Sequence, residues 1–286
     1  MRWIALDIYQ GLNNVYNGWI WWNLFLAFIP MLLSFRLFRR KAIPPIWFAI
    51  ACFGTALIGI VGLKSRIPRL RWAMSGAISN IQAGDPGTML QLVWLAGVMV
   101  VALGISILLF KLSHTSKLWL WWIGLATFIA FLPNAPYVLT DIIHLLRGAS
   151  SGTIKIWVIT FLFIPMHMTA IVLGFEAYVL SLLNVSFYLR QKGLQALTLP
   201  VELSIHALCA VGIYLGRFIR LNSWDVVVDP TSVLASTLNT LTSKRPLAVI
   251  VFSFILLTVL YWLMKQVTLG LKLRIHYARR GLSALD

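Results

Sequence analysis

Acidic residues are scarce in this 286-residue sequence, which holds 8 Asp and Glu against 24 Lys and Arg. Only 11% of the residues are charged, whereas 60% are hydrophobic. A soluble domain carries about 25% charged residues, so this chain lacks the polar side chains to cover a water-facing surface. The composition excludes a soluble globular protein, a disordered chain and a nucleic-acid-binding module. The net charge of +16 is expected to face anionic membrane head groups.

Cysteine is scarcer still, with two residues in the whole chain. Cys52 and Cys209 lie far apart in apolar stretches and form no CxxC pair, which excludes a disulfide framework and a thiolate zinc site. Residues 1–17 lack both a long apolar stretch and a small-residue cleavage site. The first hydrophobic helix is therefore expected to serve as the insertion signal.

Long apolar runs, in contrast, are abundant, and a membrane-spanning helix needs about 20 mostly apolar residues. Runs of about this length lie at 18–38, 43–63, 89–110, 118–140, 154–183, 200–216 and 247–269. We therefore predict an all-α, polytopic integral membrane helical bundle that forms a single multi-pass membrane domain over 1–286. It has about seven transmembrane helices, or six if 43–63, which starts at Pro44-Pro45 and holds three glycines, is re-entrant.

Two further patterns concern packing and orientation. The spacings Gly54 to Gly59 and Gly212 to Gly216 predict close helix packing. The FRLFRRK cluster after the first run and the basic C-terminal tail favour a chain with its N-terminus outside and its C-terminus inside. The KSRIPRLR stretch favours the opposite orientation.

Polar residues gather at one membrane face, where the first and fifth runs start and the fourth and sixth runs end. These residues are Asn23, Asn134, Tyr137, Asp141, His144, Arg217, Arg220, Asn222, Trp224 and Asp225. Ionisable groups in a bilayer are costly, so each is a functional candidate. Asp141 and His144 are spaced i, i+3 and would form an acid–base pair on one helix face. Arg217 and Arg220 would bind the anionic group of a phosphate or lipid head group.

An alternative interpretation of the same residues is a structural cap. Pro133 and Pro136 break or kink the fourth helix and free backbone carbonyls that need partners. In this interpretation an arginine of the sixth run pairs with Asp141 or Asp225 and so stabilises the kinked helix.

A second group of polar residues lies toward the opposite face. Glu202 and His206 are spaced i, i+4 in the sixth run, and Glu176 of the fifth run reaches a similar depth if the two helices form a hairpin. Another histidine of the fifth run, His167, lies further from this group. Three roles remain open: structural pairing between helices, a proton relay, or a metal site completed by a ligand from elsewhere. Apart from such a metal, no cofactor is expected.

Three motifs carry a family resemblance: WNLFLAFIP at 22–30, FLPNAPYVLTDIIHL at 131–145 and GIYLGRFIRLNSWDVVVDP at 212–230. With them the chain resembles an uncharacterised bacterial multi-pass membrane protein family known as domain of unknown function 1361. Residues 43–117 match less clearly and look like an insertion with two extra helices. The resemblance implies an inner-membrane protein of the bacterial cytoplasmic membrane, and it implies no activity.

The sequence holds no Walker loop, no HExxH and no GxSxG. The expected function is therefore that of a transporter-like or membrane-complex (scaffold or assembly) protein with a polar pocket at one membrane face. The alternative is a membrane-embedded hydrolase or transferase that acts on a lipid-linked or phosphate-bearing substrate. The expected partners are membrane lipids with anionic head groups, and no nucleic acid.

Overall fold

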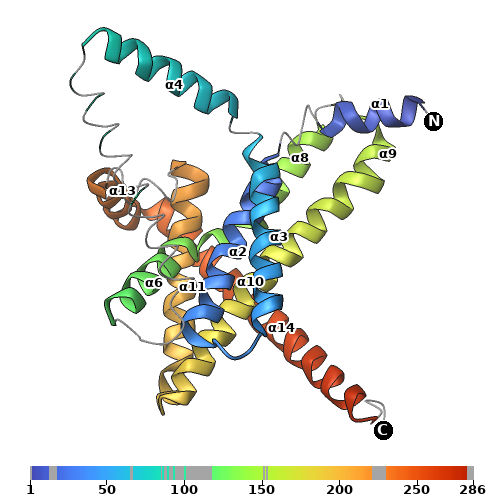
Figure 1. Ribbon diagram of the computed structural model, residues 1–286, viewed down its shortest axis with the longest axis vertical. Helices are drawn as coiled ribbons and strands as arrows, with labels where there is room; N and C mark the ends of the chain where they lie inside the picture. The colour runs from blue at the N-terminus through green and yellow to red at the C-terminus, as the bar shows by residue number, and fades with distance from the viewer. Residues whose placement is uncertain are drawn as a thin grey trace.

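The computed structural model describes residues 2–12, 18–64, 67–84, 118–150, 154–220 and 230–281, with the isolated residues 86, 89, 93, 100 and 152. Every regular element in these ranges is a helix, which confirms the all-α prediction (Figure 1). Six helical segments are long and apolar enough to cross a membrane. They are Trp19–Phe38, Pro45–Leu63, Trp119–Ser150, Ile156–Gln191, Gln195–Ile219 and Lys244–Arg279. The predicted span 89–110 lies almost wholly outside the described residues.

Helices α2 (Trp19–Phe38) and α10 (Ile164–Gln191) pack along each other at the centre of the bundle (Figure 1). Their buried faces meet in one apolar core that also takes side chains from α6, α11 and α14. One polar contact crosses this core, where Asn184 Nδ2 donates to Ser34 Oγ at 3.0 Å. Because a buried amide is costly without a partner, this bond fixes the register of α10 against α2.

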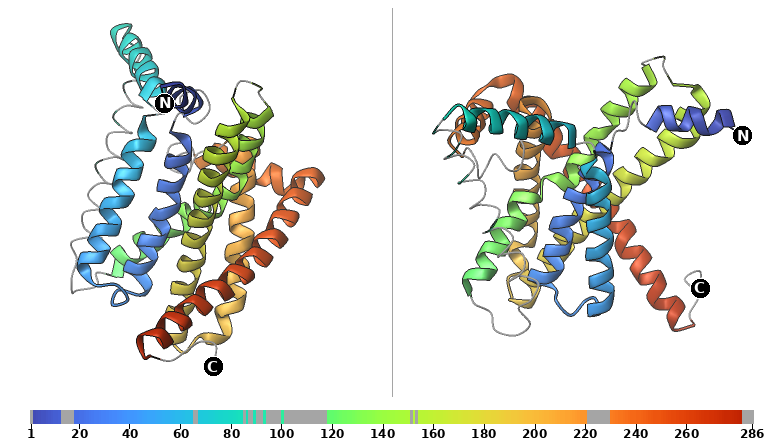
Figure 2. Two further views of the ribbon diagram at one scale, coloured as in Figure 1. Left: turned by 90° about the vertical axis from the view of Figure 1, so that its right-hand side faces the viewer. Right: turned by 45° about the horizontal axis from the view of Figure 1, so that its top comes forward.

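Helix α3 (Pro45–Leu63) is continuous, and it runs antiparallel to α2 as a hairpin partner (Figure 2). Pro45 occupies the first turn, where its missing N–H group has no helical partner to lose. A Cβ at Gly62 would lie 2.5 Å from the backbone nitrogen of Trp22, and one at Gly59 would lie 2.8 Å from the Phe25 ring. Gly54 has open space around it, so the predicted close packing holds for Gly59 and is wrong for Gly54.

The fourth apolar run forms a broken helix. Helix α6 (Leu118–Phe131) ends before Pro133, and the chain continues through α7 (Asn134–Tyr137), the 3₁₀ segment η2 (Val138–Asp141) and α8 (Ile142–Ser150). Proline cannot donate a backbone hydrogen bond and clashes with the preceding turn, which explains the break. A Cβ at Gly212 would lie 2.7 Å from Pro133, so α11 packs closely against this break.

The remaining spans are longer than predicted, the fifth at its C-terminal end and the other two at both ends. The fifth comprises α9 (Ile156–Val158), the π-helical segment η3 (Ile159–Phe163) and α10. The sixth comprises the 3₁₀ segment η4 (Gln195–Leu197), α11 (Thr198–Tyr214) and the π-helical segment η5 (Leu215–Ile219). The last is the single helix α14 (Lys244–Arg279).

Three shorter helices lie at one end of the bundle: α1 (Arg2–Gly11), α4 (Ile67–Gln82) and α13 (Pro230–Thr242) (Figure 2). Helix α1 lies beside α9, where the Trp3 and Trp157 rings meet edge to face and Asp7 pairs with Lys155 at 2.9 Å. Leu63 ends α3 near the start of α2, whereas Trp121 of α6 stacks on Tyr188 near the end of α10. The chain therefore changes ends of the bundle between Leu63 and Leu118.

Candidate functional site

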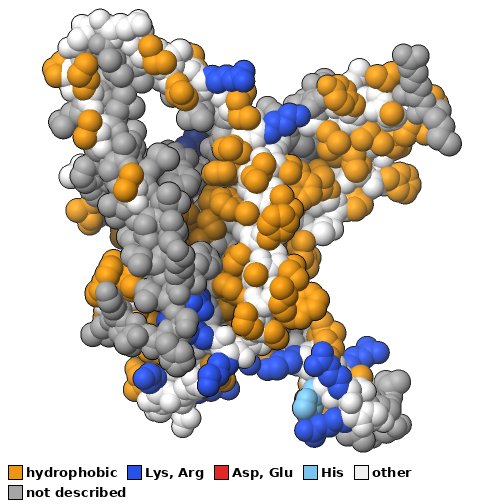
Figure 3. Space-filling view, viewed as in Figure 1, with side chains coloured by type: hydrophobic (Ala, Val, Ile, Leu, Met, Phe, Trp, Pro, Cys, Tyr) orange, Lys and Arg blue, Asp and Glu red, His pale blue; other side chains and the backbone are white. Residues whose placement is uncertain are grey.

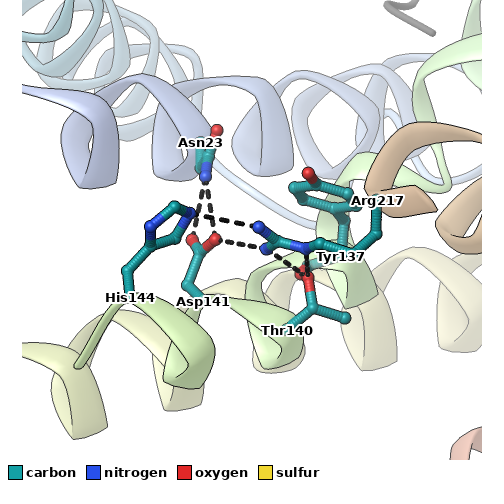
Figure 4. A network of polar contacts seen from close by, with 6 residues as sticks. All are labelled: Asn23, Tyr137, Thr140, Asp141, His144 and Arg217. Atoms are coloured by element: carbon teal, nitrogen blue, oxygen red, sulfur yellow. Dashed lines mark hydrogen bonds and ion pairs between the residues drawn. The ribbon is translucent and has the colours of Figure 1, made fainter. Parts of the chain in front are cut away.

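Six side chains form a polar network at the end of the bundle where α2 begins, and we call this network the Asp141 cluster (Figure 4). Helix α2 provides Asn23, the segment η5 provides Arg217, and the broken fourth helix provides the other members. The complete set is Asn23, Tyr137, Thr140, Asp141, His144 and Arg217. Helix ends that were predicted to share one face thus meet in space.

Asp141 is the buried centre of this cluster, with 1% of its surface exposed. Asn23 Nδ2 donates to its two carboxylate oxygens at 3.1 and 2.9 Å, and Arg217 Nη2 donates to Oδ1 at 2.8 Å. The carboxylate therefore receives donors from α2 and from η5, two segments far apart in the sequence. Charge-assisted bonds of this kind are among the stronger contacts in proteins, so they tie three parts of the bundle together.

Arg217 uses all three of its guanidinium nitrogens within the cluster. Nε donates to Thr140 Oγ1 at 2.9 Å, Nη2 donates to Thr140 and Asp141, and Nη1 lies 3.1 Å from His144 Nε2. The guanidinium carbon also lies 4.5 Å from the centre of the Tyr137 ring. Arg217 lies in the π-helical segment η5, and its side chain reaches Thr140 and Asp141 of η2.

His144 contacts the cluster through its ring edge and its ring face. A guanidinium only donates, so Nε2 accepts from Arg217 and the ring proton is at Nδ1. The Trp19 ring lies on the imidazole with centroids 4.3 Å apart, and Trp19 also contacts His167 at 5.7 Å. His167 is buried, and its Nδ1 lies 2.8 Å from the carbonyl oxygen of Phe163.

The predicted acid–base pair is thus bridged by a cation. Asp141 and His144 both bond to Arg217 (Figure 4). The Asp141–Arg217 ion pair is the pairing that the structural-cap interpretation requires. The proton-transfer roles of Asp141 and His144 remain a prediction.

The other residues predicted for this face take different positions. Tyr137 joins the cluster through Arg217, and Asn134 Nδ2 donates to the carbonyl oxygen of Phe131 at 3.0 Å, beside the helix break. Arg220 is exposed and ends η5 with a left-handed backbone (φ 68°). Asn222, Trp224 and Asp225 lie outside the described residues.

A second network, which we call the Glu202 cluster, comprises Ser186, Glu202, Tyr261 and Lys265. Glu202 Oε1 accepts from Ser186 at 2.8 Å, from Tyr261 at 2.7 Å and from Lys265 at 2.8 Å. Lys265 also reaches Oε2 at 3.1 Å, and its ammonium lies 5.1 Å from the Tyr261 ring. This cluster joins α10, α11 and α14 near the opposite end of the bundle.

The two other residues of the predicted Glu176–Glu202–His206 group form hydrogen bonds with other partners. His206 Nδ1 lies 2.6 Å from the Tyr178 hydroxyl, and its ring contacts Tyr261 at 4.8 Å. Glu176 accepts from Thr268 Oγ1 at 2.9 Å. Among the described residues, no group of three or more His, Cys, Asp or Glu is placed to hold a metal ion.

Sequence reasoning missed Thr140, Ser186, Tyr261 and Lys265. Lys265 could have been identified from the sequence. It lies inside the predicted span 247–269, and a lysine in an apolar run needs an acidic partner. Thr140, Ser186 and Tyr261 are ordinary residues for membrane helices, so nothing in their type or spacing distinguished them.

The comparison with protein families gives a match over more than half of the chain. The profile of a family described as Protein of unknown function (DUF1361) matches residues 94–259. The matched range includes Asp141, His144, Glu202 and Arg217, whereas Asn23 and Lys265 lie outside it. The motif at 22–30 precedes the match, and the motifs at 131–145 and 212–230 lie inside it. The comparisons with curated proteins and with solved structures give no match.

Proposed function

The chain belongs to the family described as Protein of unknown function (DUF1361), and on that premise we propose that it is a scaffold within a membrane complex. In this proposal the Asp141 cluster locks three helical segments at one membrane face. The observation that carries the proposal is the pairing of Asp141 and Arg217 with each other and with Asn23, Thr140 and His144. A cluster whose charged groups bond to one another holds helices in place and leaves little capacity to bind a ligand.

The core between the two clusters supports the same function. On α11, the buried residues Cys209, Ala210 and Ile213 separate His206 from Arg217, and each is at most 5% exposed. The broken fourth helix adds Leu132, Ala135 and Val138, all fully buried. A close-packed apolar layer of this kind excludes water, so it favours a rigid bundle over a polar path through the protein.

A transporter-like function is the second candidate, because the helices are interrupted beside the Asp141 cluster. Broken helices and π-helical segments are common at functional sites in membranes. The break at Pro133 and the segment η5, which holds Arg217, would be the points at which the helices bend. Among the described residues, we find no geometry that favours a hydrolase or transferase.

Two variants beside the wild type test the scaffold proposal: His144→Ala and Asp141→Asn. The measurements are the thermal stability of each purified protein and the ability of its gene to restore the wild-type phenotype in a deletion strain. For a scaffold, function declines only as far as stability declines, so His144→Ala keeps most of both. A His144→Ala protein with wild-type stability and no function would contradict the proposal and favour a chemical role for the imidazole.

The transporter-like candidate predicts a different result for purified protein in vesicles. A purified wild-type protein in vesicles would then move a solute, and Arg217 substitutions would change that movement without a matching loss of stability. Ion or solute flux that depends on the protein, measured in such vesicles, would replace the scaffold proposal with the second candidate.

A further inference from the structure

The C-terminal third of α14 extends beyond the rest of the bundle. The last buried residue in this helix is Tyr261, and every described residue from Leu269 onward is exposed. Lys265 pairs with Glu202 in the second turn of α11, and Thr268 bonds to Glu176 near the middle of α10, so α14 crosses α10 obliquely and leaves the bundle after this point. Figure 1 shows the remainder of the helix extending away from α10 and α11, and the right panel of Figure 2 agrees.

This extension, residues 269–281, carries basic and apolar side chains together. Lys272, His276 and Arg279 are spaced i, i+4, i+7 and lie on one helix face, with Arg280 beside them. Leu271 and Ile275 are spaced i, i+4 and are 58% and 46% exposed, while Leu269 and Leu273 lie on the same side of the helix as the basic residues and are 40% and 53% exposed. No Asp or Glu occurs in the extension. Figure 3 shows its Lys and Arg side chains among others at the same end of the molecule.

The length of α14 places this extension at a membrane surface. Its 36 residues make a helix about 54 Å long, whereas the hydrocarbon core of a bilayer is about 30 Å thick. Figures 1 and 2 show α14 inclined to α2 and α3, so its end stays near the surface instead of projecting straight from it. Exposed Leu271 and Ile275 would be unfavourable in bulk water, and they are favourable at the boundary between head groups and acyl chains.

We propose that residues 269–281 form an interfacial helix that binds the anionic head groups of the bilayer around the protein. The exposed apolar side chains enter the acyl boundary, and Lys272, Arg279 and Arg280 contact the phosphates. The long stem of Arg274 allows its charge to reach the head-group level as well. The absence of acidic side chains in the extension makes an anionic surface the complementary partner. This contact does not depend on the role of the Asp141 cluster.

Hydrogen exchange of the full-length protein in vesicles tests the proposal. We compare vesicles of phosphatidylcholine alone with vesicles that also contain phosphatidylglycerol. Each basic residue near an anionic surface contributes about a fivefold factor in affinity, so the backbone amides of 269–281 should exchange about tenfold or more slowly with phosphatidylglycerol present. High salt should reverse this protection.

Two matched variants show whether the effect belongs to the extension. The first replaces Lys272, Arg274, Arg279 and Arg280 with Gln, and the second replaces four exposed basic residues at the opposite end: Lys64, Arg71, Lys244 and Arg245. Only the first variant should lose the protection of 269–281. Equal exchange in the two kinds of vesicle, or equal effects of both variants, overturns the proposal, as does protection that requires an added protein instead of the lipid.

Discussion

At the scale of single residues, the account depends on charged groups that lie in apolar surroundings. The chain has eight acidic residues, and Asp141 and Glu202 each form an ion pair with a basic residue on another helix. An isolated charge in such surroundings is costly, so removing one partner of a pair should cost more than the pair itself contributes. The next prediction tests this asymmetry, and the one after it tests a neutral donor to Glu202.

Arg217→Gln should destabilise the protein by about 3–5 kcal/mol, because it leaves the Asp141 carboxylate buried without its cation. Asp141→Asn should cost less, since Arg217 keeps Thr140 and His144 as acceptors. Arg217→Lys should recover only part of the loss, because a single ammonium lacks the planar arrangement of donors that reaches all three acceptors. Denaturant unfolding in detergent measures these free energies, and a larger loss for Asp141→Asn than for Arg217→Gln would refute the argument.

Tyr261→Phe should destabilise the protein by about 1.5–3 kcal/mol, because the hydroxyl donates to the carboxylate of Glu202 at 2.7 Å. Tyr277→Phe provides a control on the same helix, since Tyr277 is exposed and should change the free energy of unfolding by less than about 0.5 kcal/mol. Equal unfolding free energies for the two variants would show that the Glu202 cluster contributes nothing through this hydroxyl.

At the scale of helices, close approach between neighbours depends on single glycines. In α3, a Cβ added at Gly62 would meet the backbone of Trp22, whereas one added at Gly54 would meet nothing within 4 Å. The two residues are therefore a matched pair, equal in chemistry and different only in their neighbours.

Gly62→Ala should destabilise the protein by about 1–3 kcal/mol, because the new methyl group forces α3 away from α2. Gly54→Ala should be neutral or more stable by up to about 1 kcal/mol, since alanine is the better helix former and the space is open. Thermal unfolding of both proteins in one detergent measures the difference, and similar midpoints would contradict the packing shown here.

The apolar runs predicted where helices lie, since about 20 apolar residues have few other stable arrangements. Their order along the chain also predicted that Asn23, Asp141, His144 and Arg217 meet at one face. The sequence did not predict that Glu202 pairs with Lys265, because that contact depends on the rotation and tilt of α14 against α11. It also did not show which glycines pack, since Gly54 and Gly62 differ only in what lies across the helix interface.

At the scale of the whole molecule, charge and topology suggest an orientation. The start of α2 and the end of α14 lie at opposite ends of the bundle (Figure 2). The end of α14 shares its level with Arg39, Arg40, Lys41 and Lys192, which suits a cytoplasmic face under the positive-inside rule. We therefore propose that the C-terminus faces the cytoplasm of a bacterial inner membrane.

A fusion of green fluorescent protein to the C-terminus should then fluoresce, and a fusion of alkaline phosphatase at the same position should be inactive. Alkaline phosphatase activity without fluorescence would reverse the orientation. Removal of the basic residues of FRLFRRK should weaken the preference, because short basic loops contribute most to it.

The central claim is that the Asp141 cluster is a structural lock, and the double variant Asp141→Asn with Arg217→Gln tests it most directly. This variant removes both charges and keeps polar groups of similar size, so it leaves no unpaired charge in the cluster. We predict that its unfolding free energy is closer to wild type than that of Arg217→Gln alone. We also predict that its gene restores the wild-type phenotype in the deletion strain. A double variant that folds with wild-type stability and restores no function would contradict the account, because the charges themselves would then be required.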